Sequence, residues 1–237
     1  MQTIMKSNSF FTRLLDLIAP RTCVVCDNRL AIEEEIICGR CNVRLPRTGY
    51  SYDAYENEMA KVFWGRIPVE RCAPFMYYQA RAASANLIYL LKYHNRPDIG
   101  EYLGRMMAEE LKKDYFFEDI DLIIPIPLER KRQRQRGYNQ SLMIAKGVSD
   151  ATALPIDTGI IVRKVYESSQ TEKNRWMRNE NVEGVFQLLQ PEKAQGKHIL
   201  LIDDVVTTGA TISSCGQELA KAGDVKISVM SIGFAKH

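Results

Sequence analysis

The part of this sequence best suited to chemistry is a pair of acids followed by a turn of small hydroxyl residues. Residues 198–211 read HILLIDDVVTTGAT, so Asp203 and Asp204 come directly after a short apolar run. That run predicts a buried parallel strand, and the apolar spacing from Ile212 to Ala222 predicts a helix after the turn. The sequence therefore predicts a strand, an acidic pair, a small-residue turn and a helix, in that order.

The start of the predicted helix is suited to binding phosphate. The first amides of a helix have no partners within it, and the helix dipole makes that end positive. Thr207, Thr208 and Thr211 would add hydroxyl donors, and Gly209 would let the backbone approach a ligand closely. The nucleotide-binding patterns G-x-x-x-x-G-K-[ST] and G-x-G-x-x-G are both absent from the sequence.

The two acids suit a different part of the same ligand. Asp203 and Asp204 would repel a phosphate but would accept hydrogen bonds from neighbouring hydroxyls. A ligand with a phosphate close to a vicinal diol, such as ribose 5-phosphate, fits both halves. Adjacent side chains of a strand point to opposite faces, so both acids reach one sugar only if the chain bends there. The alternative, that these acids are solvated loop residues, leaves the turn and the helix after them unexplained.

The stretch LLIDDVVTTGAT resembles the signature of type I phosphoribosyltransferases, which bind phosphoribosyl pyrophosphate (PRPP). The resemblance implies that Asp203 and Asp204 hold the ribose hydroxyls. It implies that the 5-phosphate lies against Thr207, Thr208, Gly209, Ala210 and Thr211. It also implies that magnesium is bound together with PRPP.

Four of the six cysteines form two closely spaced pairs, CVVC at 23–26 and CGRC at 38–41. Two CxxC pairs at this distance have the spacing of a structural zinc site, which predicts Cys23, Cys26, Cys38 and Cys41 as ligands. Disulfides are the weaker reading for a chain expected in the cytoplasm. The metal would form the core of a module of about 50 residues, which buries too little surface by itself.

Composition and periodicity predict an ordinary α/β protein. The chain has 237 residues, 46% hydrophobic and 26% charged, with a net charge of +3 and no apolar run long enough to span a membrane. Predicted strands alternate with predicted helices along the chain, which favours a parallel sheet. The strands are at 121–126, 159–165, 199–203 and 226–234, with a short one at 184–188, and the helices are at 80–93, 99–113, 139–150 and 211–222. We expect a zinc-ribbon module with a leading amphipathic helix over 1–50, an irregular connector over 51–75 and a phosphoribosyltransferase-like domain over 76–237.

A strongly basic run follows the strand predicted at 121–126. It places five basic residues between Arg130 and Arg136, which is either a solvated face or an anion site at a strand end. The phosphoribosyltransferase resemblance implies that residues here and after the next strand hold the pyrophosphate: Ile126, Pro127, Arg130, Arg163 and Lys164. The charged segment 166–183 predicts a mobile loop that could bring in Lys173, Arg175 or Arg178 on closing.

Further stretches resemble a narrower family. LLKYHNR (90–96), PIPLERKRQRQRGYNQS (125–141) and SSQTEKNRWMRNENVEGVF (168–186) precede LLIDDVVTTGAT, behind the four-cysteine module. Together they resemble the ComF family of bacterial competence proteins over nearly the whole chain. Many members carry two pairs of zinc knuckles, but here 50–75 holds only Cys72, so a second zinc site is not expected.

Three functions follow from these patterns. The first is PRPP binding with magnesium-dependent phosphoribosyl transfer to an unknown acceptor, in a protein of DNA uptake. The second is a non-catalytic PRPP or nucleotide sensor that binds single-stranded DNA, with the basic run along phosphates and Tyr138 and Trp176 stacking bases. The third is a zinc module that docks on competence machinery proteins. The sequence indicates no catalytic base, nucleobase pocket or oligomeric state.

Overall fold

The computed structural model describes residues 20–164 and 184–236 of the chain. Its contacts divide the chain into two compact units, Met1–Leu45 and Pro46–His237. Within the described residues, no helix is long and apolar enough to cross a lipid bilayer. The amphipathic helix predicted before the cysteines lies outside the described part of the chain.

The described part of the first unit is small and is built around its cysteines. It contains one short helix, α2 (Gly39–Arg44), which begins directly after the third cysteine of the cluster. The Glu34 carboxylate accepts hydrogen bonds from the backbone N–H groups of Ala31 at 2.7 Å and Gly39 at 2.6 Å. This side chain therefore fixes the loop that joins the two cysteine pairs.

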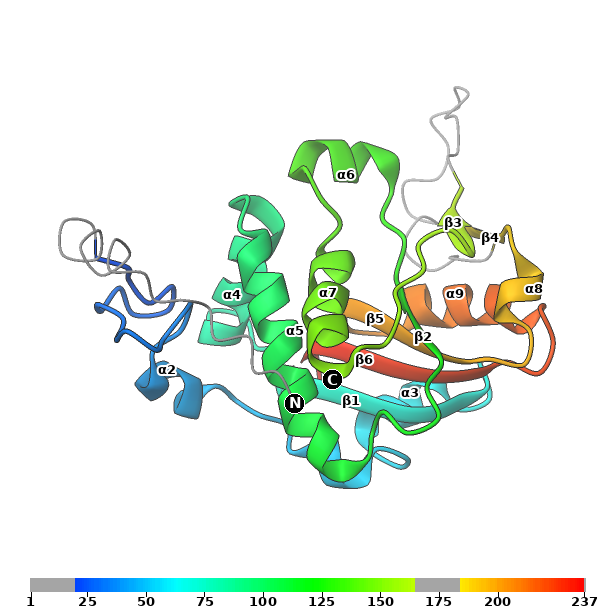
Figure 1. Cartoon of the computed structure of the whole chain (residues 1–237), viewed down its shortest axis with the longest axis horizontal. Coiled ribbons are helices and arrows are strands. Elements are labelled where there is room, and N and C mark those ends of the chain that lie inside the picture. The colour runs from blue at the N-terminus through cyan, green and yellow to red at the C-terminus, as the bar shows by residue number, and fades with distance from the viewer. Residues whose placement is uncertain (1–19, 165–183, 237) are drawn as a thin grey trace. The chain divides into compact units, whose positions relative to one another are not determined.

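The second unit is built on a four-stranded parallel sheet in the order β1–β6–β5–β2, seen in Figure 1. The strands are β1 (Val69–Tyr77), β2 (Leu122–Pro125), β5 (His198–Val206) and β6 (Lys226–Phe234). All of β2 and the apolar start of β5 are buried, as in a parallel sheet that is covered on both faces. The predicted α/β class is confirmed, and three of the five predicted strands lie in this sheet.

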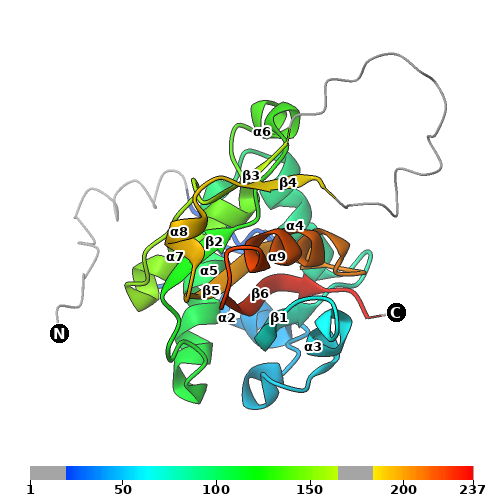
Figure 2. The ribbon, with the colours of Figure 1, turned by 90° about the vertical axis from the view of Figure 1, so that its right-hand side faces the viewer.

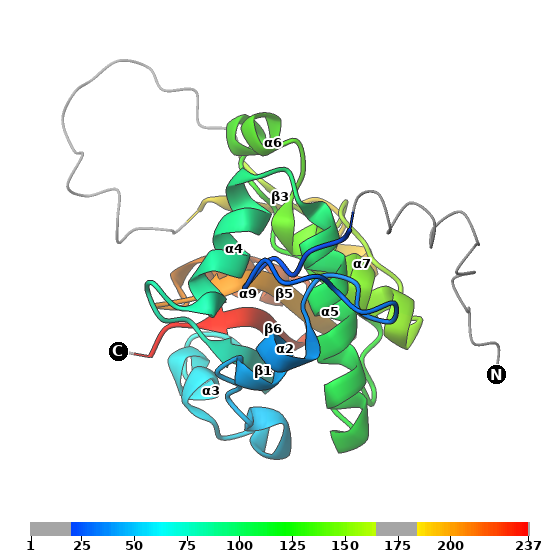
Figure 3. The ribbon, with the colours of Figure 1, turned by 90° about the vertical axis from the view of Figure 1, so that its left-hand side faces the viewer.

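Helices cover both faces of this sheet. The opposite views in Figures 2 and 3 show two layers, with α4 (Ala83–Tyr93), α5 (Pro97–Leu111) and α7 (Gln140–Thr152) on one side and α3 (Glu58–Phe63) and α9 (Ala210–Ala220) on the other. The remaining helical elements in the described part of the second unit are η1 (Tyr50–Asp53), η2 (Lys112–Asp114), α6 (Arg130–Arg136) and α8 (Pro191–Ala194). The helices predicted from apolar periodicity correspond to α4, α5, α7 and α9.

Helices α5 and α7 pack so closely that only glycine fits at their contact. A Cβ atom at Gly104 would lie 2.1 Å from the backbone oxygen of Ile144, and one at Gly147 would lie 2.0 Å from that of Glu101. Real Cβ atoms do not approach a backbone atom so closely. The glycines thus bring α7 tightly against α5, and α7 carries residues of the candidate site at its N-terminus.

The segment predicted as an irregular connector, 51–75, is folded. It forms most of η1, all of α3 and most of β1, which pairs in parallel with β6. The sequence does not show an apolar strand pattern for β1, because the strand contains Cys72, Pro74 and the charged pair Glu70 and Arg71. Proline is tolerated because β1 lies at the edge of the sheet.

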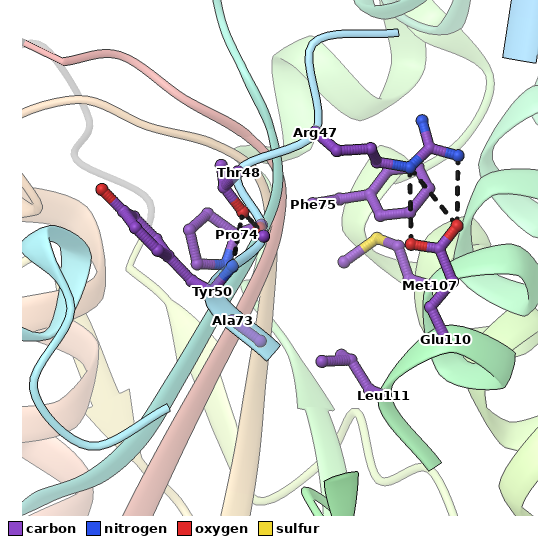
Figure 4. Close-up of a pocket in the computed structure, with 10 residues that line it drawn as sticks. Arg47, Thr48, Tyr50, Ala73, Pro74, Phe75, Met107, Glu110 and Leu111 are labelled. Carbon is purple, nitrogen blue, oxygen red and sulfur yellow. Dashed lines mark hydrogen bonds and ion pairs between the residues drawn. The ribbon is translucent and has the colours of Figure 1, made fainter. Parts of the chain in front are cut away.

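The outer edge of β1 is covered by the first residues of the second unit (Figure 4). Thr48 donates its hydroxyl to the Pro74 carbonyl at 2.5 Å. Arg47 lies over the ring of Phe75, 3.9 Å from its centroid, and pairs with Glu110 at 3.2 Å. These side chains border a cavity of about 60 Å³, too small for a substrate, so we interpret the contacts as an anchor that protects the sheet edge.

The strand predicted at 159–165 does not join the parallel sheet. It forms β3 (Ile161–Arg163), which pairs antiparallel with β4 (Phe186–Leu188) in a separate two-stranded sheet. Ile161 and Phe186 are buried against the main core, so this small sheet lies on the domain although its hydrogen bonds do not continue the main sheet. Apolar content alone predicts a strand but not the sheet it joins.

Candidate functional site

The acidic pair lies inside β5, past the end of its neighbour β2. The strand continues through Asp203 and Asp204 to Val206, so the prediction that it ends at the pair is wrong. Pairing with β2 stops at Ile202, whereas pairing with β6 continues to Val206. The acids therefore lie at the carboxyl end of the sheet, along an edge of β5 that β2 no longer covers, where ligands of parallel sheets bind.

The two carboxylates have different partners, both in helices on the same side of the sheet. Asp203 accepts hydrogen bonds from the Ser141 hydroxyl at 3.1 Å and from the backbone N–H of Asp204 at 2.9 Å. Asp204 pairs with the ammonium group of Lys92 on α4 at 2.9 Å. Sequence patterns did not indicate Lys92 or Ser141, although both lie in the stretches LLKYHNR and RGYNQS that carry the ComF resemblance.

The pKa of Asp203 is raised from 3.8 to about 7. Burial is the main cause, and the negative charge of Asp204 raises the pKa further. The Asp204 amide, Lys92 and Ser141 act in the opposite direction. A carboxyl group with this pKa gains or loses its proton near neutral pH, and a cation nearby would stabilise its charged form.

The turn after β5 forms a small open hollow at the start of α9. Residues Asp203 and Val205–Ile212 line a cavity of about 40 Å³, in which Thr207 and Thr208 are exposed. Gly209 is the N-cap of α9, with a φ of 72° and no side-chain cap. The positive end of an 11-residue helix therefore faces this hollow beside Asp203.

Gly209 is required by the protein and not only by a ligand. A Cβ atom there would lie 2.5 Å from Cγ1 of Val62 and 2.9 Å from Cε1 of Phe63, both on α3. The prediction that this glycine serves the close approach of a ligand therefore misses its packing against α3. Arg66, just after α3, also donates to the Thr208 carbonyl at 3.1 Å. The segment read as a connector thus supports the turn.

The residues predicted around the pyrophosphate lie in the segment after β2 and at the end of β3, and Ile126 contacts the strand that carries the acids. Ile126 donates its backbone N–H to the Ile202 carbonyl at 2.9 Å, and its own carbonyl accepts from the Asn139 amide at 2.9 Å. Asn139 is also the N-cap of α7 and accepts from the Ser141 amide. The RGYNQS stretch therefore ties the loop that begins at Ile126 to the residue that holds Asp203.

Arg163 on β3 interacts electrostatically with both the basic helix α6 and the acid Asp203. Its pKa is lowered, first by burial and then by the positive charge of Arg132 on α6, while Asp203 acts in the opposite direction. Its guanidinium carbon lies 5.6 Å from the centroid of the Phe186 ring. Lys164 is exposed at the end of the described segment. The predicted loop residues Lys173, Arg175 and Arg178, and Trp176, lie outside the described residues.

Two further sequence predictions concern single residues. Arg130 and the other members of the basic run form α6, in which no residue is buried. Tyr138, considered as a base-stacking residue, is half-buried and donates its hydroxyl to the Leu91 carbonyl on α4. Its ring is therefore held as part of the contact between α4 and the start of α7.

The four cysteines of the first unit form a compact cluster. The sulfur atoms of Cys23, Cys26, Cys38 and Cys41 all lie within 4.8 Å of one another. Cys26 and Cys38 are 3.8 Å apart, the sulfur–sulfur spacing of a tetrahedral site with Zn–S bonds of about 2.3 Å. Burial opposes ionisation of Cys23, but backbone hydrogen bonds, chiefly from Cys38, lower its pKa to about 7. Four sulfur donors in this arrangement could hold a metal such as zinc.

Comparisons with known proteins agree with this picture. Residues 138–235 match the phosphoribosyl transferase domain. The chain is 28% identical over 211 residues to DNA utilization protein YhgH of Escherichia coli O157:H7, covering 87% of each chain. It is 28% identical over 153 residues to Competence protein F of Haemophilus influenzae, covering 63% of this chain and 67% of that one.

Solved structures are more distant. Glutamine PRPP amidotransferase from B. subtilis, complexed with ADP and GMP, gives a TM-score of 0.40 at 20% identity, over 60% of this chain and 30% of that one. Purine phosphoribosyltransferase from Pyrococcus horikoshii gives a TM-score of 0.35 at 19% identity, over 62% and 87%. The domain match over residues 138–235 and the homologues named Competence protein F and DNA utilization protein, together with the parallel sheet and the cysteine cluster, support the ComF family with a phosphoribosyl transferase domain.

Proposed function

We propose that this chain binds PRPP at the carboxyl end of β5 and acts in the uptake or use of DNA during natural competence. The observation that carries the proposal is the position of Asp203 and Asp204, past the end of β2 and beside the first turn of α9. The DNA role is inferred from the names of the homologues, DNA utilization protein and Competence protein F.

The chain's own residues would divide the ligand between them. Asp203 and Asp204 would accept the ribose hydroxyls, with Ser141 and Lys92 holding the two carboxylates in place. The 5-phosphate would lie in the hollow formed by Thr207, Thr208, Gly209, Ala210 and Thr211. Because a phosphate at a helix N-terminus gains backbone donors and a favourable dipole, no cationic side chain is needed there.

The pyrophosphate of PRPP calls for positive charge. Ile126 and Pro127 follow the end of β2, Arg130 begins α6, Arg163 ends β3, and Lys164 comes directly after it. Magnesium fits the donor chemistry, because the two neighbouring carboxylates offer the hard oxygen ligands that it prefers. A divalent cation would also reduce the repulsion between the two carboxylates, which contributes to the raised pKa of Asp203. When bound, this ion would neutralise charge on the pyrophosphate as it leaves.

Transfer of the phosphoribosyl group to an acceptor is the enzymatic form of this proposal. Among the described residues near the acids, only Asp203 has a pKa raised to near neutrality. Ribose binding would occupy that carboxylate, so we assign no catalytic base. We keep phosphoribosyl transfer as the first candidate and a non-catalytic PRPP sensor as the second.

The second candidate has its own observation. Helix α6 places five basic residues on a short element without a single buried residue, and this exposed helix is suited to following the phosphates of single-stranded DNA. A protein that binds PRPP without turnover and binds DNA through α6 would be a sensor. Zinc in the first unit is structural in both cases, since four cysteine ligands leave no open position.

Calorimetry with PRPP and magnesium tests the shared part of both candidates. We expect Asp204→Asn to weaken PRPP binding roughly ten- to a hundredfold, because a charged hydrogen bond contributes about 1.5–3 kcal/mol. Asp98→Asn is the matched control, since Asp98 also pairs with a cation, Arg96, at 2.7 Å but lies away from the acids in the chain. Ribose 5-phosphate should compete with PRPP, and deoxyribose 5-phosphate should compete less well.

The outcomes separate the candidates. Equal PRPP affinity of Asp204→Asn and the parent would exclude the ribose assignment. If PRPP binds normally, a pyrophosphate-release screen over nucleobases and nucleotides then distinguishes transfer from sensing. Release above the buffer rate with any acceptor supports the enzyme, and binding without release supports the sensor.

A further inference from the structure

A cationic pocket lies between the C-terminal end of α4 and α6. It has a volume of about 440 Å³ and is lined by Lys92, Tyr93, Asn95, Arg132, Gln135 and Arg136. Figures 1 and 3 both show α6 beside the end of α4. Binding sites for small molecules typically measure about 300–1,000 Å³. The pocket is therefore large enough for a ligand, unlike the hollow next to the α9 turn.

The lining gives this pocket the charge of an anion site. Three of the six lining residues are cations, and none is an acid. On α6, Arg132 and Arg136 are one helical turn apart and line the pocket together, whereas Arg134 does not line it. The basic run is thus not uniform, because one face of the helix borders a pocket and the rest of it faces solvent.

An aromatic strip extends from the pocket along α4. The Arg136 guanidinium lies 5.3 Å from the centroid of the Tyr93 ring. Tyr89 lies 5.2 Å from Tyr93 and 5.1 Å from His94, measured between ring centroids. Tyr89 and Tyr93 are 52% and 62% exposed, so both have ring surface free for a ligand. A bare phosphate or pyrophosphate has no use for such a strip, but a nucleobase stacks on it.

The pocket also adjoins the acidic pair. Lys92 lines the pocket, and its ammonium group lies 2.9 Å from the Asp204 carboxylate. A ligand phosphate here would be held by Arg132 and Arg136, with Lys92 shared between that phosphate and Asp204. The pocket therefore places a second ligand next to the proposed ribose site.

We propose that this pocket binds a nucleoside phosphate, with the phosphate between Arg132 and Arg136 and the base on the strip of Tyr93 and Tyr89. The inference goes beyond the PRPP site and does not depend on PRPP binding. The ligand is either a free nucleotide or the phosphorylated end of a nucleic acid strand. Both sources present the same chemistry, which is a phosphate one sugar away from a base.

The test is a titration of the zinc-loaded full chain with adenosine 5′-monophosphate, without PRPP. We expect Arg132→Ala and Tyr93→Ala each to weaken binding roughly tenfold, from the loss of a charged hydrogen bond or of base stacking. Tyr93→Phe keeps the ring and should bind like the parent. Arg134→Ala is the matched control, because it removes the same charge from the same helix outside the pocket lining, and it should leave the affinity unchanged.

Other ligands separate the alternatives. Adenosine should bind at least tenfold more weakly than the nucleotide, since it lacks the phosphate. Tighter binding of adenosine 5′-monophosphate than of a 5′-phosphorylated tetranucleotide would identify a free nucleotide as the ligand. The reverse order would identify the end of a nucleic acid strand, and both results support the pocket. Binding of pyrophosphate as tight as that of the nucleotide, or equal losses in Arg134→Ala and Arg132→Ala, would overturn the proposal. PRPP affinity of the same variants is measured separately, so failure of the PRPP site is distinguishable.

Discussion

The two units of this chain hold their functional residues in place by different interactions. The first unit gathers four sulfur atoms within 4.8 Å, and its described part buries few large side chains, among them Leu30 and Ile37. The second unit buries apolar side chains on both faces of a parallel sheet and aligns its site through α7 and α9. A metal can thus replace a core in a short segment, whereas the acidic site depends on packing between distant segments.

The largest effect is expected where the second unit relies on close helix packing. Alanine has a higher helix propensity than glycine by about 1 kcal/mol, so Gly104→Ala would stabilise an isolated α5. In the fold, its Cβ would lie 2.1 Å from the Ile144 oxygen, and we expect a net loss of about 3 kcal/mol or more. Denaturant unfolding measures it. Gly159→Ala, whose Cβ meets only ordinary contacts, is the control, and equal stability of both variants would contradict the packing argument.

The next largest effect is expected from replacing a cysteine, which should unfold the first unit and leave the second unit folded. Cys23→Ser or Cys38→Ser removes one of four ligands, and structural zinc supplies much of the folding free energy of such modules. We expect loss of bound zinc and increased proteolysis within residues 1–45, while the melting of the sheet domain is unchanged. Cys215→Ala removes a buried thiol from α9, outside the cluster, and should keep full zinc content. Equal zinc content in all variants, measured by metal analysis, would contradict the assignment of the four cysteines as zinc ligands.

A smaller effect is expected from the acid held inside the second unit. The pKa of Asp203 is raised from 3.8 to about 7, so the folded chain binds more protons than the unfolded chain between these values. Its contribution to stability therefore falls as the pH rises through this window. Asp203→Asn should be more stable than the parent at pH 8, by on the order of 2 kcal/mol, and lose this advantage near pH 4.

Urea unfolding of the parent and Asp203→Asn across this pH range measures the difference. Asp98→Asn serves as the control, because Asp98 is also a carboxylate paired with a cation, Arg96, at 2.7 Å. An advantage of Asp203→Asn that grows toward low pH would show that the acid stabilises the fold as a charged group. PRPP binding should be weakened in the same variant, so stability and ligand affinity are expected to change in opposite directions.

The same contrast explains what the sequence could predict. Ligand spacing in CVVC and CGRC, and the order of LLIDDVVTTGAT, are local signals, and they indicated the cysteine cluster and the β5–turn–α9 unit. Strand β1 was missed because Pro74 and charged residues interrupt its apolar pattern. Its partner β6 lies far along the chain, so no neighbouring segment indicates the pairing either. No local signal could show that Gly209 packs on Val62, because that contact joins distant segments.

The charged partners of the acids were missed for a related reason. Lys92 lies in a helix whose periodicity predicts only its buried face, and nothing in that pattern shows that its ammonium group reaches Asp204. Likewise, the basic run was predicted as one feature, but the fold divides it into a pocket-facing pair and exposed residues. Charge composition predicts affinity for anions, whereas the geometry of a charged site requires the fold.

The smallest effect on stability, and a clear one on binding, is expected from the exposed residues of α6. Because α6 buries no side chain, Arg134→Ala should change the free energy of unfolding by less than about 0.5 kcal/mol. If the helix follows the phosphates of single-stranded DNA, the triple variant Arg132→Ala, Arg134→Ala and Arg136→Ala should flatten the plot of log K against log salt by about 2 units, roughly 0.7 for each phosphate contact.

The decisive comparison is between a long strand and a single nucleotide. On a long oligothymidylate, Arg134→Ala and Arg132→Ala should each remove a similar part of the slope, because any exposed cation can release a counterion. On adenosine 5′-monophosphate, Arg132→Ala should weaken binding and Arg134→Ala should not, because Arg132 lines the pocket and Arg134 does not. Lys113→Ala, an exposed cation just after α5, is the control for general charge loss. A slope unchanged in the triple variant would leave α6 no role along DNA and restrict its cations to the pocket and to the pyrophosphate of PRPP.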